Sequence, residues 1–259
     1  MNREKVFVAR PMRTYKKFNE EVDIIVPFRG QYEKVTRLIE SLYKITVGKF
    51  NLILVDDASN NNEYVNYLSS FKQIKCIRSE EHVGFSGALK LGYENSTSNW
   101  IVFMNSDVEI IEYSWLRNLG ECYLKYRDNA VKMVSAKNNN PCGIDEMLWE
   151  SRNKFSEDYI LKDGEHISLE CVFFHKDLFN NIGGFLKNYF PGWYEDEELA
   201  YRMNRYKFKQ AICGNSFIFH HGQSTIKEMW KKDFNMKELM ESNREKCIAD
   251  VKSLINSHI

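Results

Sequence analysis

Short apolar runs alternate with amphipathic stretches through the first hundred residues of the chain. The run Trp100–Met104 is continuously apolar, as expected for a strand that is buried on both faces. Three similar runs precede it, over residues 22–27, 52–55 and 74–78. Predicted helices lie between these runs, over residues 32–44, 64–71 and 84–92. This alternation predicts a parallel sheet with right-handed crossovers.

The second half of the chain continues the alternation less regularly. The predicted elements are a helix over 112–126, strands over 131–136, 167–174 and 217–222, a short helix over 176–181 and a helical segment over 226–256. A polar loop over 137–143 and an irregular insert over 144–165 interrupt them. In the helix that follows residue 194, Leu199 and Met203 are predicted to be buried, with Tyr206 as a further candidate, and Arg202 and Arg205 to lie on another face. Packing positions predicted for the last helical segment are Met229, Trp230, Phe234, Met240 and Ile248.

Composition narrows the class of protein without selecting a function. Hydrophobic residues make up 43% of the 259 residues, charged residues 28%, and the formal net charge is +0, so no global field attracts nucleic acid. The six cysteines form no C-x-x-C pair, which indicates free thiols in a reducing compartment. No apolar run reaches the length of a membrane span, and no signal peptide is evident. We therefore expect a cytoplasmic protein.

Polar side chains follow the predicted strands at the points where these strands end. Asn105, Ser106 and Asp107 come directly after the buried run, and Asp56 and Asp57 follow the 52–55 strand. The carboxyl ends of parallel strands meet at one edge, so these side chains are expected to face a common crevice. Asp107 is a candidate ligand for a divalent cation. The alternative is a loop of solvated acids with an Asx-type helix cap.

Two further polar clusters stand out later in the chain. Four consecutive acids over residues 195–198 follow Trp193 and Tyr194, either as a helix cap or as part of a pocket wall. His220 and His221 end the last predicted strand, either as metal ligands or as structural residues. No G-x-G-x-x-G follows the first strand and no Walker motif occurs, which disfavours dinucleotide redox chemistry and P-loop hydrolysis.

Six segments, in order over residues 22–225, resemble the motifs of the inverting, nucleotide-sugar-dependent family 2 glycosyltransferases with the GT-A fold. They read D-I-I-V-P-F, V-D-D-A-S-N-N, H-V-G-F-S-G-A-L-K-L-G, F-M-N-S-D-V-E, G-G-F with Y-E-D-E-E-L-A-Y-R, and H-H-G-Q-S-T. The sequence departs from the family pattern at three places. Asn61 or Asn62 stands where an acid is common, His82 replaces an Asn, and Asn105 replaces the first acid of the metal-binding D-x-D.

The resemblance implies a fold and its division. It implies an α/β protein with the GT-A fold, a mostly parallel central sheet flanked by helices, a C-terminal acceptor-side portion and a terminal helix. From the residues themselves, 1–21 form a basic lead-in, predicted to be a solvated tail or an edge strand in preference to a contact with a membrane surface or a partner, and 226–259 form a helical extension. The domain between them, 22–225, would divide into a nucleotide-sugar half over 22–110 and an acceptor half over 111–225.

The resemblance also implies roles for individual residues. Asp107 would bind Mn²⁺ or Mg²⁺ across the diphosphate, with His220 or His221 as a second ligand. Asp196 would be the general base, with Glu195 as its rival, and Trp193 and Tyr194 would contact the acceptor. The residues implied to bind the nucleotide sugar are Pro27, Arg29, Asp56, Asp57, Gly84, Gly87, Asn105 and Ser106.

The implied activity is transfer of a sugar from a nucleotide-diphosphate sugar to a hydroxyl of a carbohydrate or lipid-linked glycan, with inversion. Its expected setting is capsule, lipopolysaccharide or other surface-glycan synthesis at the inner face of the cell membrane, by analogy only. Association with the membrane periphery or with a polymerase complex is part of that expectation. The alternatives are a catalytically silent GT-A domain that binds carbohydrate or scaffolds a polymerase, and a sugar-1-phosphate nucleotidyltransferase. The latter is disfavoured because P-F-R-G-Q stands where a Gly-rich basic loop is usual.

Overall fold

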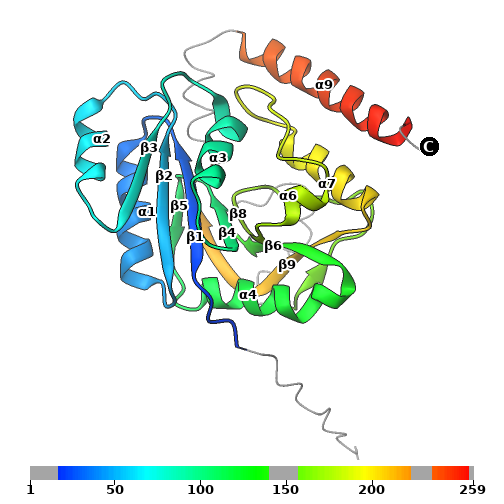
Figure 1. Cartoon of the computed structure of the whole chain (residues 1–259), viewed down its shortest axis with the longest axis horizontal. Coiled ribbons are helices and arrows are strands. Elements are labelled where there is room, and N and C mark those ends of the chain that lie inside the picture. Colours follow the sequence, from blue (N-terminus) through cyan, green and yellow to red (C-terminus); the bar gives the residue numbers. More distant parts are fainter. Residues whose placement is uncertain (1–16, 140–156, 223–234, 257–259) are drawn as a thin grey trace, which may run out of the picture.

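A single mixed sheet flanked by helices forms the body of the protein. The computed structural model describes residues 17–139, 157–222 and 235–256 (Figure 1). Neighbouring strands follow the order β3-β2-β1-β4-β8-β6-β9-β5, and β7 pairs with β9. The strands are β1 (Val22–Phe28), β2 (Phe50–Asp56), β3 (Ile74–Arg78), β4 (Trp100–Met104), β5 (Val108–Ile110), β6 (Val131–Lys137), β7 (Tyr159–Ile160), β8 (Cys171–His175) and β9 (Lys209–His220). The α-helices are α1 (Tyr32–Ile45), α2 (Asn62–Ser69), α3 (Gly84–Glu94), α4 (Trp115–Tyr126), α6 (Leu178–Asn181), α7 (Glu195–Arg205) and α9 (Met236–Asn256).

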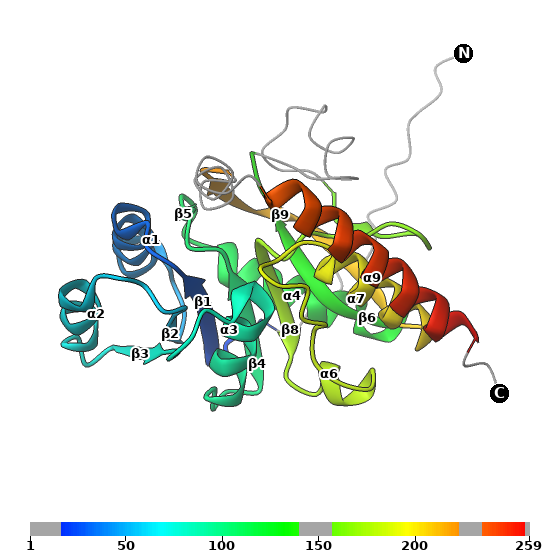
Figure 2. The same cartoon turned by 90° about the horizontal axis from the view of Figure 1, so that it is seen from above.

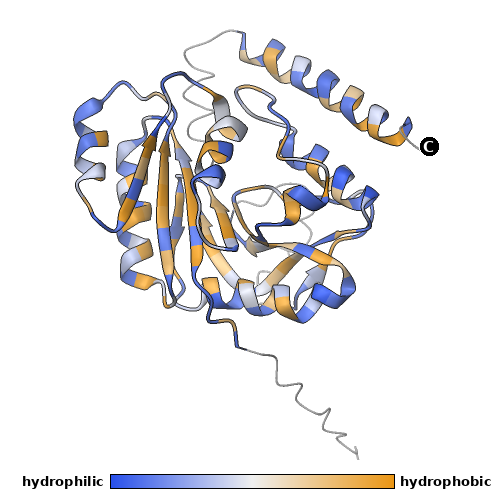
Figure 3. Ribbon diagram, viewed as in Figure 1, coloured by the Kyte–Doolittle hydropathy of each residue, from blue (hydrophilic) through white to orange (hydrophobic). Residues whose placement is uncertain are grey.

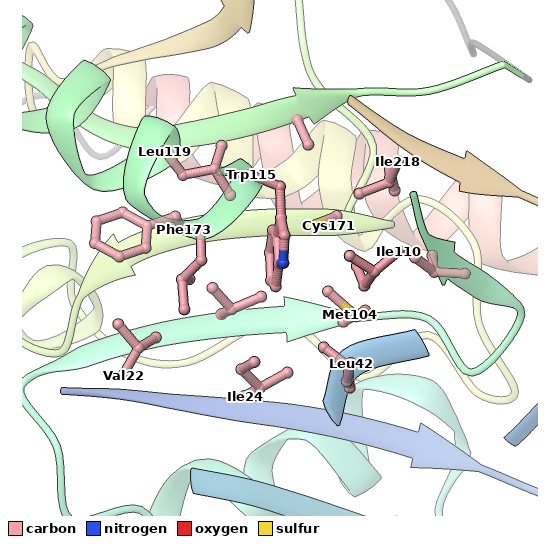
Figure 4. Packing of buried hydrophobic residues seen from close by; sticks show 14 of the residues in the cluster. Val22, Ile24, Leu42, Met104, Ile110, Trp115, Leu119, Cys171, Phe173 and Ile218 are labelled. Carbon is pink, nitrogen blue, oxygen red and sulfur yellow. The ribbon is translucent and has the colours of Figure 1, made fainter. Parts of the chain in front are cut away.

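Strand alternation separates two hydrophobic cores, one on each face of the sheet. Ile24 of β1 packs on the face covered by α1 and α4, whereas its neighbour Ile25 packs on the face covered by α3, α6 and α7. Trp115 of α4 lies at the centre of the first core, fully buried beside β1, β4 and β8 (Figure 4). The sheet strands are accordingly apolar along most of their length (Figure 3). Burial on both faces explains the continuous apolar runs that mark these strands in the sequence.

The first four strands run parallel and in close register. Val22 of β1 pairs with Phe50 of β2 and with Trp100 of β4, so the three strands start level and end at one edge. Their carboxyl ends carry Phe28, Asp56 and Met104. The polar residues that follow each strand therefore gather at this edge.

The second half of the chain adds strands of both directions. β8 is antiparallel to β4 and to β6, and β9 runs parallel to β6. The far end of β9 pairs antiparallel with β5, where Val108 faces His220. This pairing brings the end of the last strand back to the carboxyl edge, beside Asp107.

The predicted α/β class, with its GT-A-like central sheet flanked by helices, is confirmed, and the predicted helices and strands of the first hundred residues are all present. The sheet is mixed instead of mostly parallel, because four of the eight described strand pairings are antiparallel. Several later elements differ in length. β8 starts at Cys171 and β9 starts at Lys209, while β5 and β7 were not predicted. Strands of two or three residues are too short to show a period, and the start of β9 mixes polar and apolar side chains.

Some predictions fall where the structure gives no description. These are the residues 1–16 of the basic lead-in, most of the polar loop and insert over 140–156, and the packing positions Met229, Trp230 and Phe234. Lys137, placed in the polar loop, ends β6 instead. Among the described helices, none is long and apolar enough to cross a bilayer. The domain boundaries stay a prediction.

Of the packing positions predicted for the last helical segment, only Met240 and Ile248 lie in the described helix α9, and neither is fully buried. Ile248 is 43% exposed and Met240 half-buried, while the buried side chains of α9 are Met236, Asn243 and Cys247. The helix lies alongside α7 in both views (Figures 1 and 2). A polar residue, Asn243, therefore occupies the centre of its buried face.

The prediction for α7 is confirmed at two positions and wrong at two. Leu199 and Met203 are buried, but Tyr206 is 44% exposed. Arg202 was predicted on another face and is buried, because its Nη2 pairs with Glu198 Oε2 at 3.0 Å. Its Nη1 also donates to the carbonyl of Gly184 at 2.6 Å. The buried charge thus ties α7 to the glycine turn that precedes it.

We predict that Arg202→Met destabilises the protein by about 3–5 kcal/mol, because it leaves the Glu198 carboxylate buried without its partner. The double variant Glu198→Gln/Arg202→Met should recover much of that loss. The matched control is Arg244→Met on α9, whose exposed pair with Glu241 at 3.1 Å should contribute less than about 1 kcal/mol. Urea denaturation gives all three free energies, and equal losses for Arg202→Met and Arg244→Met would contradict this account.

Candidate functional site

A cavity of about 480 Å³ opens at the carboxyl edge of the parallel strands. Its walls come from the ends of β1, β2, β4 and β9, the segment before β8 and the start of α7. Of the residues predicted for the site, those lining the cavity are Pro27, Arg29, Asp57, Asn105, Ser106, Asp107, Trp193, Tyr194, Glu195, Asp196 and His220. Asp56, Gly84, Gly87 and His221 do not line it. The predicted roles stay predictions, but most of these residues share one cavity.

Asp57 links the end of β2 to the start of α3. Its Oδ1 accepts from the amide of Val83 at 2.7 Å, and its Oδ2 accepts from the amide of Gly84 at 3.0 Å. The Nδ1 of His82 lies 2.6 Å from the same Oδ2. A carboxylate at a helix N-terminus is favoured by the free N–H groups there. His82, which departs from the family pattern, thus gains a defined orientation at the cavity wall.

Asp56 does not line the cavity but bonds to the loop that follows β2. It is fully buried, and its Oδ1 accepts from the amide of Ser59 at 3.1 Å. Its Oδ2 lies 3.3 Å from Nε of Arg78. Arg29 supports the same loop by donating from Nη1 to the carbonyls of Asp57 at 2.6 Å and Ala58 at 2.9 Å. The two consecutive acids of this segment therefore have different positions.

At Gly84 and Gly87 of α3, neighbouring atoms lie too close for a side chain to fit without a shift. Gly84 has a φ of +75°, and a Cβ there would lie 3.0 Å from the carbonyl oxygen of Pro191. A Cβ on Gly87 would meet the side chain of Val83 at 2.7 Å, within the same helix. Gly84 therefore lets the segment before α7 approach the start of α3.

Asp107 and His220 meet inside the cavity. The Nε2 of His220 lies 3.0 Å from Oδ1 of Asp107, and both side chains are buried. On the other side of the ring, Nδ1 lies 3.4 Å from Oε1 of Glu170. Burial alone lowers the pKa of His220, but the two carboxylates outweigh this effect and the pKa is raised. The three groups form a line of carboxylate, imidazole and carboxylate.

His221 points elsewhere. Its Nε2 lies 2.8 Å from Oε2 of Glu109, and Nη1 of Arg37 lies 3.4 Å from the same nitrogen. Successive residues at a strand end face opposite sides, so only one of two adjacent histidines can reach the cavity. Of the two candidates, His220 is the one inside it.

The donor set in this corner fits a divalent cation. Besides the Asp107 carboxylate and the His220 imidazole, the Oδ1 of Asn105 is buried and has no hydrogen-bond partner among the described residues. Oxygen and imidazole ligands suit Mn²⁺, and oxygen ligands suit Mg²⁺. Asn105, which replaces an acid of the family pattern, still brings an oxygen that lacks a partner.

Glu170 and His166 line the cavity and were missed by the sequence reasoning. Burial raises the pKa of Glu170, and the negative charges of Asp196 and Asp107 raise it further against the opposing effect of His220. Its Oε2 accepts from Ser168 at 2.7 Å and from Asn138 at 2.8 Å. His166 follows the irregular insert, and Glu170 lies within the strand predicted over 167–174 although β8 begins only at Cys171, so neither stood at a predicted strand end.

A second group with metal-ligating atoms lies outside the cavity. Cys122, Asp158 and Cys213 place one such atom each within 4.8 Å of one another. However, the Lys125 ammonium lies 2.6 Å from Asp158, where it opposes a cation. The described cysteines are all free thiols, as predicted.

The turn that leads into α7 has an unusual backbone, and the acids at the start of α7 have shifted pKa values. Trp193 and Tyr194 have φ values of 76° and 74°, in the left-handed region that non-glycine residues rarely adopt. Glu195 is buried, and burial followed by the charge of Asp196 raises its pKa to about 8. Burial also raises the pKa of Asp196, against a lowering by His166. Strain and shifted pKa values of this kind cluster at functional sites.

The family model described as Glycosyl transferase family 2 matches residues 23–183, more than half of the chain. The chain belongs to this family. The match spans the parallel strands and the cavity corner with Asp107, and it ends at the glycine turn before α7.

Relatives of this family 2 chain agree with the assignment. An uncharacterized glycosyltransferase of Haemophilus influenzae is 28% identical over 119 residues, which are 46% of this chain and 36% of the relative. The O-antigen biosynthesis protein RfbC of Myxococcus xanthus is 20% identical over 220 residues, 78% of this chain and 17% of the relative. The chain thus spans about a third or less of the length of these two relatives.

Solved structures share the fold of this family 2 chain. GalNAc-T7 with UDP, GalNAc and Mn²⁺ has a TM-score of 0.62 at 15% identity, covering 80% of this chain and 44% of its own. The mannosyltransferase PcManGT of Pyrobaculum calidifontis, with GDP-Man and Mn²⁺, has a TM-score of 0.61 at 16% identity, covering 78% and 57%. At such identities the similarity concerns the fold alone.

The raised pKa of Glu195 predicts a pH dependence of stability. Its folded pKa of about 8 exceeds the usual 4.5, so the native state holds a proton that the unfolded state releases between these values. The stabilising contribution is therefore complete below about pH 4.5 and is lost as the pH rises through about 8. We expect the free energy of unfolding, from urea denaturation between pH 5 and 9, to fall over this window.

The control for this prediction is Glu195→Gln, which keeps the shape and cannot titrate. Its stability should fall less steeply over the same window. An identical slope in the variant and the natural protein would show that Glu195 is not the titrating group.

Proposed function

We propose that this protein transfers a sugar from a nucleotide-diphosphate sugar to a hydroxyl of a carbohydrate or lipid-linked glycan, with inversion and with the help of a divalent cation. The observation that carries the proposal is the meeting of two acidic centres in one cavity. Asp107 with His220 forms the first, and Glu195 with Asp196 forms the second. Asp107 and Asp196 both act on the pKa of Glu170, which supports their closeness. Inverting transfer needs such an arrangement, with charge stabilisation and a base on opposite faces of the sugar.

The donor side consists of the strand ends. Pro27, Arg29 and Asp57 form the floor on which the nucleotide would rest. Asp107, His220 and the Asn105 amide oxygen would hold Mn²⁺ or Mg²⁺. When bound, the cation would neutralise the negative charge that develops on the leaving diphosphate.

The acceptor side consists of the acidic turn. The acceptor oxygen forms a bond to the anomeric carbon, the bond from that carbon to the diphosphate oxygen breaks, and the hydroxyl proton passes to a carboxylate. Trp193 and Tyr194 offer aromatic rings at the cavity wall for the acceptor sugar. The inverted configuration follows from a single in-line displacement.

The unpartnered oxygen of Glu195 supports Asp196 as the base. Burial raises the pKa of both acids, and the charge of Asp196 raises that of Glu195 further, so the two titrate as a pair. The buried Oε2 of Glu195 has no hydrogen-bond partner among the described residues, which suits a neutral carboxyl better than a carboxylate. A raised pKa also makes the Asp196 carboxylate a stronger proton acceptor near neutral pH.

Surface-glycan synthesis is the setting we propose. One relative is named an O-antigen biosynthesis protein, although it is 20% identical and much longer. Under this proposal the acceptor is a growing glycan, and the protein works at the inner face of the cell membrane or within a polymerase complex. A silent scaffold domain is the competing function, and the two predictions below distinguish it.

The first prediction concerns loss of the proposed cation ligands Asp107 and His220. Asp107→Ala should leave the fold intact but abolish the manganese-dependent rise in Tm caused by UDP or GDP. For the natural protein that rise corresponds to about 2.7 kcal/mol at a hundredfold excess over Kd. His220→Ala should weaken Mn²⁺ binding by at least about tenfold.

The matched control is His221→Ala, the adjacent histidine outside the cavity, which should change Mn²⁺ binding less than about twofold. Equal losses for both histidines would contradict the assignment of His220. Manganese-dependent turnover of nucleotide sugars at the natural rate in Asp107→Ala would contradict the assignment of Asp107 as a cation ligand.

Loss of the base is the second prediction. Asp196→Asn keeps the size of the side chain but removes the proton acceptor, so kcat should fall about 10²–10⁴-fold while the donor Kd stays unchanged. Initial rates with UDP- and GDP-sugars and isothermal titration with the free nucleotides measure the two quantities.

Glu195→Gln is the partner variant. If Asp196→Asn is active and Glu195→Gln is inactive, Glu195 is the base. If both retain natural turnover, the acidic turn is structural. A natural protein that binds nucleotide with Mn²⁺ but transfers no sugar would favour the scaffold function.

A further inference from the structure

The segment that leads into the acidic turn has no regular structure, yet each of its carbonyls has a donor. From residue 189 to 192, four consecutive carbonyls accept hydrogen bonds from outside the segment. The Nδ2 of Asn243 on α9 donates to the carbonyls of Tyr189 at 2.9 Å, Phe190 at 3.0 Å and Gly192 at 2.9 Å. The remaining carbonyl, that of Pro191, accepts from the amide of Phe85 in α3 at 2.9 Å. Residues 189–192 are therefore hydrogen-bonded to α9 on one side and to α3 on the other.

One face of α9 makes the rest of this contact. Asn243, Cys247 and Asp250 follow the i, i+4, i+7 spacing of a single helix face. The thiol of Cys247 lies 3.8 Å from the carbonyl oxygen of Tyr194, and Asp250 Oδ2 accepts from the hydroxyl of Tyr189 at 2.8 Å. Asn243 itself is fully buried. A polar side chain at the centre of a buried helix face has a cost unless it is hydrogen-bonded. Here the loop carbonyls bond the Nδ2 of Asn243, whereas its Oδ1 is buried with no hydrogen-bond partner among the described residues.

The turn needs such external support because its backbone is unfavourable. Trp193 and Tyr194 both lie in the left-handed region, and conformations of this kind persist only where the surroundings hold them. Glu195 and Asp196 follow directly, at the first positions of α7. Their placement in the cavity therefore depends on what holds residues 189–192.

We propose that Asn243 is a positioning residue for the acceptor side of the cavity. Through the two Nδ2 hydrogens of Asn243, shared among three carbonyls, the last helix holds the turn that carries Trp193, Tyr194 and the two candidate base residues. The inference rests on the proposed function for its effect on catalysis, but not for its effect on the turn. The hydrogen bonds of α9 given above all go to residues 189–194, on the acceptor side, so loss of Asn243 should separate the two sides of the site.

The test uses Asn243→Asp in the full chain, a nearly isosteric change that removes the Nδ2 donor and turns a carboxylate oxygen toward three carbonyls. Hydrogen–deuterium exchange should become about tenfold faster or more at residues 192–198 and at the Phe85 amide, whose partner is the Pro191 carbonyl. Exchange in β1 and β4 should stay unchanged. The matched control is Asn256→Asp, the same substitution at an exposed position of the same helix.

Asn243→Ala serves as a second variant that introduces no charge, and it should loosen the same amides. If neither variant changes exchange at residues 192–198, Asn243 does not hold the turn. If both accelerate exchange in β1 and β4 to the same degree, Asn243 stabilises the whole fold and the positioning role is wrong.

Kinetics test the catalytic consequence. With UDP- and GDP-sugars and Mn²⁺, kcat of Asn243→Asp should fall about 10–10²-fold, because small displacements of reacting groups are costly, while the donor KM changes less than about twofold. A donor KM that rises as much as kcat falls would overturn the separation of the two sides. If the natural protein transfers no sugar, the proposed function fails, and the exchange result still decides the role of Asn243.

Discussion

The cavity depends on the shared register of β1, β2 and β4. Because these parallel strands start level, their carboxyl ends deliver Arg29, Asp57 and Asp107 to one edge without any long loop. The antiparallel pairing of β5 with β9 then returns His220 to the same edge from more than a hundred residues away. Side chains on rigid strand ends are held more firmly than side chains on loops. The donor side thus follows from the sheet and from short bonds within the loop after β2, whereas the acceptor side is supported from a distant helix.

That additional support explains why a polar residue sits in the middle of a helix interface. The turn before α7 has no regular secondary structure, and it contains a proline, which has no N–H to donate, and two residues in the left-handed region. Asn243 supplies the missing donors from α9, and Gly84 supplies the space that lets Pro191 approach α3. This turn therefore links α3, in the first half of the chain, to α9, the last described helix. A hydrophobic residue at 243 would leave buried carbonyls without partners, at a cost of about 1–3 kcal/mol each.

The strands and the acidic clusters could be predicted from the sequence because their signals are local. Continuous apolar runs indicate buried strands, and Asp107 follows such a run directly. The support could not be predicted in the same way. Arg202 and Asn243 are polar residues on helix faces, and their burial depends on Glu198 and on the loop carbonyls, which only the tertiary fold brings near. The choice between His220 and His221 likewise depended on the pairing of the three-residue strand β5, which shows no period.

The balance of charge in the cavity bears on how it could hold a nucleotide diphosphate. Six acids line the cavity, whereas in the described part of the chain Arg29 is the one Lys or Arg side chain that lines it. Its Nη1 is already engaged by two backbone carbonyls. A diphosphate carries negative charge of its own, so it would meet repulsion from the carboxylates in a cavity of low dielectric. The proposed activity therefore requires a cation between the diphosphate and Asp107. The acid-rich wall, which at first argues against an anionic substrate, is consistent with one only if the metal binds with it.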